Sequence, residues 1–148
     1  MKPEDLITAL GPFSSNLGMK NWRLLLSETE IIAWPYNPGE STRLGFFIET
    51  GAVSDPGDLL ETSDQFQNLL NRRSLRTYEL RNVESITLHN RMSRNKVEIS
   101  CANEESDYYN ILFREKTEEY RILFRDLYPN VYREKGFSSS IWGKILKW

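Results

Sequence analysis

The stretch that decides the fold lies between residues 75 and 129 and reads LRTYEL (75–80), ITL (86–88), KVEIS (96–100), YYNILF (108–113) and TEEYRILFRDLY (117–128). Apolar and polar residues alternate in the first three segments, which is typical of strands with one buried face. The fourth segment, rich in aromatic and branched residues, continues the series of strands. In the last segment the apolar residues recur at helical spacing, and they are Tyr120, Leu123, Phe124, Leu127 and Tyr128. The order predicts an α+β fold, a bent antiparallel β-sheet or barrel capped by a C-terminal amphipathic helix that ends at Pro129.

Upstream segments add further predicted elements. Residues 22–26 and 31–36 form a predicted hairpin, joined by the short polar turn Ser27-Glu-Thr-Glu30. Pro35 lacks an N–H donor, so the second strand should end or reach an edge there. Residues 44–49 form another predicted strand. Residues 2–10 are predicted to form a short helix that Gly11-Pro12 stops, and residues 11–21 a loop.

A helical insertion is predicted at residues 54–73. Asp55 suits a helix cap and Pro56 a first helical position. The segment is either one helix or two short ones, because Thr62-Ser63-Asp64 could begin a second helix. The chain thus divides into an N-terminal segment (1–20), a main domain (21–135) and an aromatic tail (136–148).

Bulk properties narrow the class of protein. The chain has 148 residues, enough for one domain with its own core, and a net charge of −2, which argues against a nucleic-acid partner. Cys101 is the single cysteine, so an internal disulfide is impossible. No stretch approaches the ~20 apolar residues of a membrane span, and the N-terminus does not read as a secretory signal. We therefore expect a soluble, cytoplasmic protein.

The first hairpin (22–32), the strand and bend YELRNVESITL (78–88), and residues 109–113 leading into the helix together resemble the PH-like superfold, particularly bacterial PH and GRAM-type domains. The resemblance covers about residues 21–128, and the 54–73 insertion departs from it. It implies a bent sheet closed at one end by the helix, and a binding scaffold. Phosphoinositide-binding members place basic residues on the first two strands and their loop. Here Glu28 and Glu30 occupy that loop and would repel a multiply charged headgroup.

The sequence indicates no catalytic or metal site. His89 is the single histidine, and acid–base chemistry would require a partner such as Glu98 or Cys101 beside it. The simpler interpretation is a polar residue at a strand end, with Cys101 as a small packing residue. Phosphate-loop, zinc-protease, dinucleotide-binding and nucleophile-elbow motifs do not occur. We expect no cofactor, no metal and no enzyme activity.

Candidate binding residues fall into two groups. The first is basic and would form a patch for an anionic partner if adjacent strands brought it together: Arg72, Arg73, Arg76, Arg91 and Arg94. A solvated face with interleaved glutamates is the ordinary alternative. The second group lies in the tail and comprises Trp142, Lys144, Lys147 and Trp148. The tail could anchor to a membrane or a partner groove, or fold back on its own domain.

These observations predict a non-enzymatic PH-like binding module that acts through protein–protein contacts, self-association included. The alternative is a peripheral membrane adaptor that uses the tail and the basic patch. An enzyme built on distant carboxylates is the third hypothesis, and it requires a cleft that holds a carboxylate with a perturbed pKa.

Overall fold

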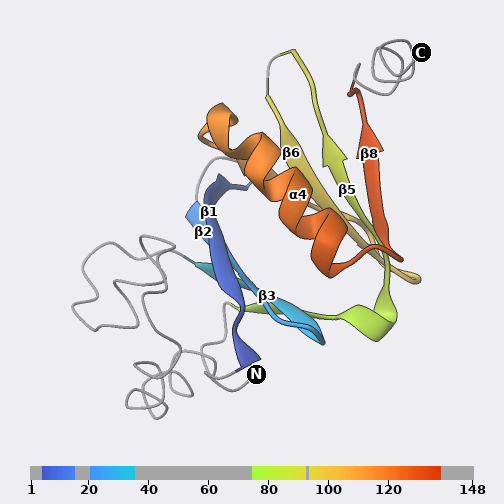
Figure 1. Cartoon of the computed structure of the whole chain (residues 1–148). Coiled ribbons are helices and arrows are strands. Elements are labelled where there is room, and N and C mark those ends of the chain that lie inside the picture. The colour runs from blue at the N-terminus through green and yellow to red at the C-terminus, as the bar shows by residue number, and fades with distance from the viewer. Residues whose placement is uncertain (1–4, 16–20, 36–74, 93, 138–148) are drawn as a thin grey trace, which may run out of the picture.

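The computed structural model describes residues 5–15, 21–35, 75–92 and 94–137. In these residues eight strands form one sheet in the order β4-β3-β2-β1-β7-β6-β5-β8, and helix α4 lies across its concave side (Figure 1). The strands are β1 (Thr8–Ser14), β2 (Asn21–Leu26), β3 (Glu30–Pro35), β4 (Arg76–Glu79), β5 (Val83–His89), β6 (Lys96–Cys101), β7 (Asp107–Ile111) and β8 (Tyr132–Lys135). Helix α4 spans Thr117–Leu127, and two short 3₁₀ turns are η2 (Leu80–Asn82) and η3 (Arg114–Lys116).

The core lies between α4 and the concave face of the sheet. Phe124 of α4 is completely buried, and Tyr120 and Tyr128 are nearly so. They join one cluster with apolar side chains of the sheet, among them Leu24, Leu26, Ile31, Ile86, Leu88, Val97 and Ile99. Leu123 and Leu127 are partly buried against this cluster. The helical periodicity therefore predicted the packing face of α4 correctly, with Phe124 at its centre.

The first hairpin is confirmed. Strands β2 and β3 pair from Trp22 opposite Pro35 to Leu26 opposite Ile31. The turn closes because the Ser27 N–H donates to the Glu30 carbonyl and the Glu30 N–H donates to the Ser27 hydroxyl, both at 3.0 Å. A short serine side chain can thus satisfy the backbone of a tight turn.

The sheet is open and mixed, which corrects the expectation of an antiparallel sheet or barrel. In the described part of the chain β4 and β8 are the outermost strands, and β8 runs parallel to β5, with Ile86 opposite Tyr132 and His89 opposite Lys135. Strand β8 was not predicted, because its sequence YREK is short and largely charged. Tertiary pairing with β5 decides its conformation instead.

Strand β1 corrects the predicted helix at residues 2–10 and the predicted loop at 11–21 over residues 8–14, while residues 2–4 and 16–20 lie outside the described residues. This strand pairs with β2, from Thr8 opposite Leu26, and with β7, at Phe13 opposite Ile111. The Gly11-Pro12 pair lies where the register shifts between Leu10 and Phe13, and such irregularities admit proline within a sheet. Gly11 has φ +137°, and a Cβ there would lie 2.9 Å from the Trp22 carbonyl oxygen, so this position requires glycine.

Several predictions lie outside the described residues. They are the strand at 44–49, the helical insertion at 54–73, and the tail from residue 138 onward. A search of the described residues finds no helix that combines the length and the apolar character needed to cross a membrane.

Candidate functional site

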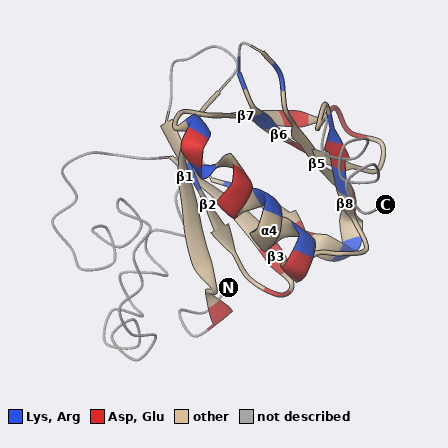
Figure 2. Ribbon diagram, turned by 45° about the horizontal axis from the view of Figure 1, so that its top comes forward, with Lys and Arg blue, Asp and Glu red and all other residues tan. Residues whose placement is uncertain are grey.

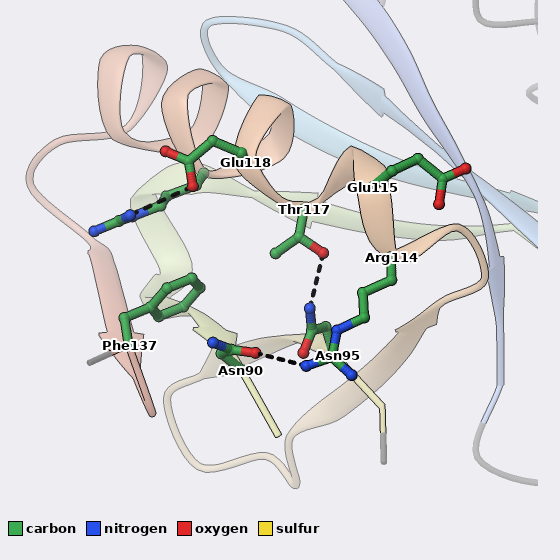
Figure 3. Close-up of a pocket in the computed structure, with 8 residues that line it drawn as sticks. Asn90, Asn95, Arg114, Glu115, Thr117, Glu118 and Phe137 are labelled. Atoms are coloured by element: carbon green, nitrogen blue, oxygen red, sulfur yellow. Dashed lines mark hydrogen bonds and ion pairs between the residues drawn. The ribbon is translucent and has the colours of Figure 1, made fainter. Parts of the chain in front are cut away.

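A polar groove of about 370 Å³ lies where three parts of the chain meet (Figure 3). Asn90 and Asn95 come from the turn between β5 and β6. Arg114 and Thr117 come from the segment that enters α4, and Phe137 follows β8. The groove therefore depends on residues that are up to 47 positions apart in the sequence. No local sequence pattern could have revealed it.

Asn95 forms the floor of the groove and is 4% exposed. Its side-chain Nδ2 donates to Thr117 Oγ1 at 2.9 Å, and its Oδ1 accepts from the Arg91 N–H at 3.1 Å. The backbone carbonyl oxygen of Asn95 accepts from the Ile111 N–H at 2.9 Å. A buried amide with these partners ties the β5–β6 turn to β7 and to the start of α4, so the groove has a rigid base.

Arg114 crosses the groove and is exposed. It donates from Nη1 to the Met92 carbonyl oxygen at 3.0 Å and from Nη2 to Asn90 Oδ1 at 3.4 Å. A guanidinium has five N–H donors, so three remain after these two bonds. Among the described residues, no carboxylate lies within ion-pair distance of Arg114.

The opposite wall contains an arginine that is already neutralised. Arg121 bonds Glu134 through Nε at 2.5 Å and Nη2 at 3.1 Å, and its guanidinium lies 4.7 Å from the centre of the Phe137 ring. The Arg121 hydrogen bond holds the pKa of Glu134 below its ordinary value. Glu118 also pairs with Arg121, at 3.4 Å. Of the two groove arginines, Arg114 is thus the one whose charge can serve a ligand.

Exposed apolar and basic residues lie next to the groove residues along the chain. Met92, at the tip of the β5–β6 turn, is 99% exposed, while Leu112 and Phe113 before η3 are 43% and 48% exposed. Arg91 and Arg94 belong to the same turn as Met92 and are exposed. Figure 2 shows Lys and Arg in blue on the β5–β6 hairpin. Hydrogen bonds hold the two segments together, since the Ile111 N–H donates to the Asn95 backbone carbonyl and the Arg114 side chain donates to the Met92 carbonyl. We call Arg91, Met92, Arg94, Leu112, Phe113 and Arg114 the tip surface.

The basic residues predicted to form one patch are divided by the structure. Arg91 and Arg94 lie at the β5–β6 end of the sheet. Arg76 lies near the β6–β7 turn, at the opposite end of β6, where it pairs with Glu104 at 2.5 Å and Asp107 at 3.3 Å. Arg72, Arg73, Trp142, Lys144, Lys147 and Trp148 lie outside the described residues. Met92, Phe113 and Arg114 were missed because an exposed turn and a helix approach have no periodic pattern.

A larger hollow of about 540 Å³ lies beside the first hairpin turn. Glu28, Glu30 and Glu79 line it together with Arg81, whose side chain pairs with Glu79 at 2.7 Å. Repulsion of a phosphorylated headgroup by Glu28 and Glu30 at this hairpin stays a prediction. We therefore place the candidate site at the tip surface and its groove.

His89 and Cys101 do not form a catalytic pair. His89 is 5% exposed, and its Nε2 lies 2.7 Å from Glu98 Oε1. Burial opposes the charged form of Glu98, but hydrogen bonds from His89 and from neighbouring hydroxyls outweigh it and lower the pKa of that carboxyl. Cys101 lies at the other end of β6, opposite Val83, and burial raises the pKa of its thiol. In the described residues no three His, Cys, Asp or Glu side chains converge as metal ligands would.

Comparison with known proteins assigns no family. No protein-family model matches the chain, and no curated protein matches its sequence. One similar solved structure is described as the structure of the Spt16D Pob3N heterodimer. The match has a TM-score of 0.49 and 11% identity, and it covers 87% of this chain and 54% of the other, so this chain spans about half the length of that one. A likeness of this strength assigns neither a family nor a function.

Proposed function

We propose that this chain is a non-enzymatic, PH-like binding module that acts through protein–protein contacts made by the tip surface. The observation that carries the proposal is that Met92, Leu112 and Phe113, each at least 43% exposed, belong to the same two chain segments as the groove residues Asn90, Asn95 and Arg114. Exposed apolar side chains clustered beside polar groups are typical of protein interaction surfaces. Methionine, aromatic residues and arginine are also the residue types that interfaces favour.

The PH-like part of the proposal rests on the order of the elements. A β2–β3 hairpin is followed by further antiparallel strands, and α4 then lies on the concave face of the bent sheet (Figure 1). Strand β1 and the parallel strand β8 are additions to that plan. The partner on this proposal is a protein in the cytoplasm, a second copy of the chain included.

The second candidate function is peripheral membrane attachment. Met92 stands 99% exposed between Arg91 and Arg94, an arrangement that suits insertion beside anionic headgroups. Each basic residue near an anionic membrane contributes only about 1 kcal/mol, so the tip would bind weakly without a further anchor. The tail residues Trp142 and Trp148 could supply that anchor.

The test compares three versions of the full chain. The double variant Met92→Ser/Phe113→Ser removes the apolar contacts, and Ile7→Ser is the matched control, because Ile7 is 38% exposed at the opposite end of β1. Proteins retained from a cell extract by the wild type and the control, but not by the double variant, are purified and titrated calorimetrically. We expect a loss of about 2 kcal/mol or more in binding free energy for the double variant.

Two results would contradict the proposal. Equal binding by all three versions would place the contact elsewhere on the molecule. Flotation with phosphatidylserine vesicles, without a protein partner, would favour the membrane function. Light scattering at two protein concentrations identifies the case in which the partner is a second copy.

A further inference from the structure

Resting on the proposed function, we infer that the groove beside the tip surface binds an acidic side chain of the partner, with Arg114 as the residue that receives the carboxylate. The partner segment is thus an acidic peptide with neighbouring apolar residues. The inference adds a ligand chemistry to the surface, which exposure alone does not specify.

The groove offers several N–H hydrogen-bond donors to a ligand. Arg114 keeps three N–H donors after its bonds to Met92 and Asn90. The Asn90 side chain accepts from Arg114 through Oδ1, and within the described part of the chain its Nδ2 group donates to no other residue, so it can donate to a ligand. In Figure 3 the Asn90 amide nitrogen points toward Phe137, across the groove. A ligand with several acceptor oxygens matches these donors, and a carboxylate accepts two parallel bonds from a guanidinium.

The Arg114 side chain is held in place before any ligand binds. Its two bonds attach the guanidinium to the β5–β6 turn, and that turn is tied through the Asn95 amide to Thr117. A long arginine side chain that is already positioned loses less conformational entropy on binding. Its contact with Met92 also places the charge directly beside the exposed apolar tip.

The charge around the groove also favours an acidic partner. Arg91 and Arg94 make no ion pair with any described residue, and the Lys116 ammonium donates to the Gly11 carbonyl oxygen at 3.4 Å. The carboxylates on the groove are Glu118, which pairs with Arg121, and Glu115, which points away from Asn90 and Asn95 in Figure 3. This end of the molecule therefore presents an unbalanced positive charge to a partner, although the chain as a whole carries −2.

The groove favours a peptide over a lipid surface because its donors lie in a hollow. Asn90 and Arg114 line a concavity of about 370 Å³, at the small end of the range for ligand pockets. Met92 is 99% exposed and Asn90 is half-buried, so we expect a flat layer of headgroups to meet Met92 first, whereas a flexible peptide side chain can enter the groove.

The experiment is an NMR titration of the ¹⁵N-labelled full chain. The probe is the peptide acetyl-Glu-Leu-Asp-Phe-Glu-Asp-amide, and the control probe replaces each acid with its amide. Because the inferred contact is to a carboxylate, any flexible acidic peptide of this kind should bind. We expect shifts in the side-chain amide signals of Asn90 and in the Nε–H signal of Arg114 with the acidic peptide only.

Charge variants assign the contact. Arg114→Gln should lower the affinity for the acidic peptide roughly tenfold or more, which is the loss expected for a charge-assisted hydrogen-bonded pair. The matched control Arg81→Gln removes the same charge at η2, beside the first hairpin turn, and should bind like the wild type. Melting temperatures of both variants establish that each is folded.

Three outcomes would overturn the inference. The first is that the two peptides bind equally or not at all. The second is an effect of Arg81→Gln as large as that of Arg114→Gln. The third is that sodium acetate at equal concentration produces the same Asn90 shifts, which would indicate a site for any simple anion. Vesicles of phosphatidylcholine and phosphatidylserine that shift these signals when the peptide does not would assign the surface to membranes. If a partner depends on Met92 and Phe113 but not on Arg114, this inference fails and the proposed function stands.

Discussion

The phenol oxygen of Tyr78 on β4 hydrogen-bonds to that of Tyr109 on β7, although β3, β2 and β1 lie between these strands in the sheet. The sheet must therefore bend far enough for the face of its outermost strand to meet β7. Tyr78 also donates to Asp107 Oδ2 at 2.6 Å. Burial raises the pKa of both phenols, so both stay protonated and able to donate. This contact fastens an open sheet without the backbone pairing that closes a barrel.

We expect Tyr78→Phe to lower the free energy of unfolding by about 1–3 kcal/mol, because Tyr109 would lose a buried hydrogen-bond partner and Asp107 a part-buried one. Chemical denaturation measures the change. The double variant with Tyr109→Phe should cost less than the sum of the two single variants, since it removes both hydroxyls of one bond. Strict additivity would contradict a direct contact.

Phe124→Ala should lower the free energy of unfolding by about 3–5 kcal/mol, because Phe124 is fully buried at the centre of the contact between α4 and the sheet. Ile122→Ala on the same helix is the control. Ile122 is 43% exposed, and its truncation should change stability by about 0.5 kcal/mol or less. A near-neutral result for Phe124→Ala in denaturant melts would be incompatible with the packing of α4.

The Arg121–Glu134 pair should contribute to acid sensitivity. Because the hydrogen bond from Arg121 lowers the pKa of Glu134, the folded protein binds a proton at this site less readily than the unfolded chain. The resulting stabilisation is present above the ordinary pKa of 4.5 and is lost as the pH falls through the lower folded value. Glu134→Gln should therefore flatten the fall in unfolding free energy as the pH drops below the ordinary pKa of 4.5.

Arg121→Gln provides the matching control for this pH experiment. It removes the largest cause of the shift in the Glu134 pKa while leaving the carboxyl in place, so it should flatten the same part of the curve. Parallel curves for the wild type and both variants would show that the pair contributes nothing to acid sensitivity.

Truncation tests whether the C-terminal tail acts as an anchor. A chain that ends at Phe137 keeps the contact between Phe137 and Arg121, and we expect it to retain the melting temperature of the full chain if residues 138–148 act as an anchor. Vesicle flotation then compares the two chains. Flotation of the full chain alone would assign a membrane role to Trp142, Lys144, Lys147 and Trp148. A large fall in melting temperature would instead place the tail in the core.

Only part of the candidate site could be predicted from the sequence. Arg91 and Arg94 were recognised as candidates, since basic residues around a polar turn are visible in the sequence. Arg114 was not recognised, because its role in binding depends on Asn90 and Met92, which contact it only in the folded chain. Arg76 appeared equivalent to Arg91 in the sequence, and tertiary contacts with Glu104 and Asp107 distinguish the two.

The sequence by itself determined the elements that local periodicity specifies. These are the β2–β3 hairpin, the positions of β4 to β7 and the buried face of α4, since side-chain spacing decides which residues can share a buried face. Only the tertiary structure decided that Thr8–Ser14 is a strand, that β8 runs parallel to β5, and that Asn90, Asn95 and Arg114 share a groove. The physical reason is that strand pairing and groove formation depend on partners distant in the sequence, whose contacts override local preference.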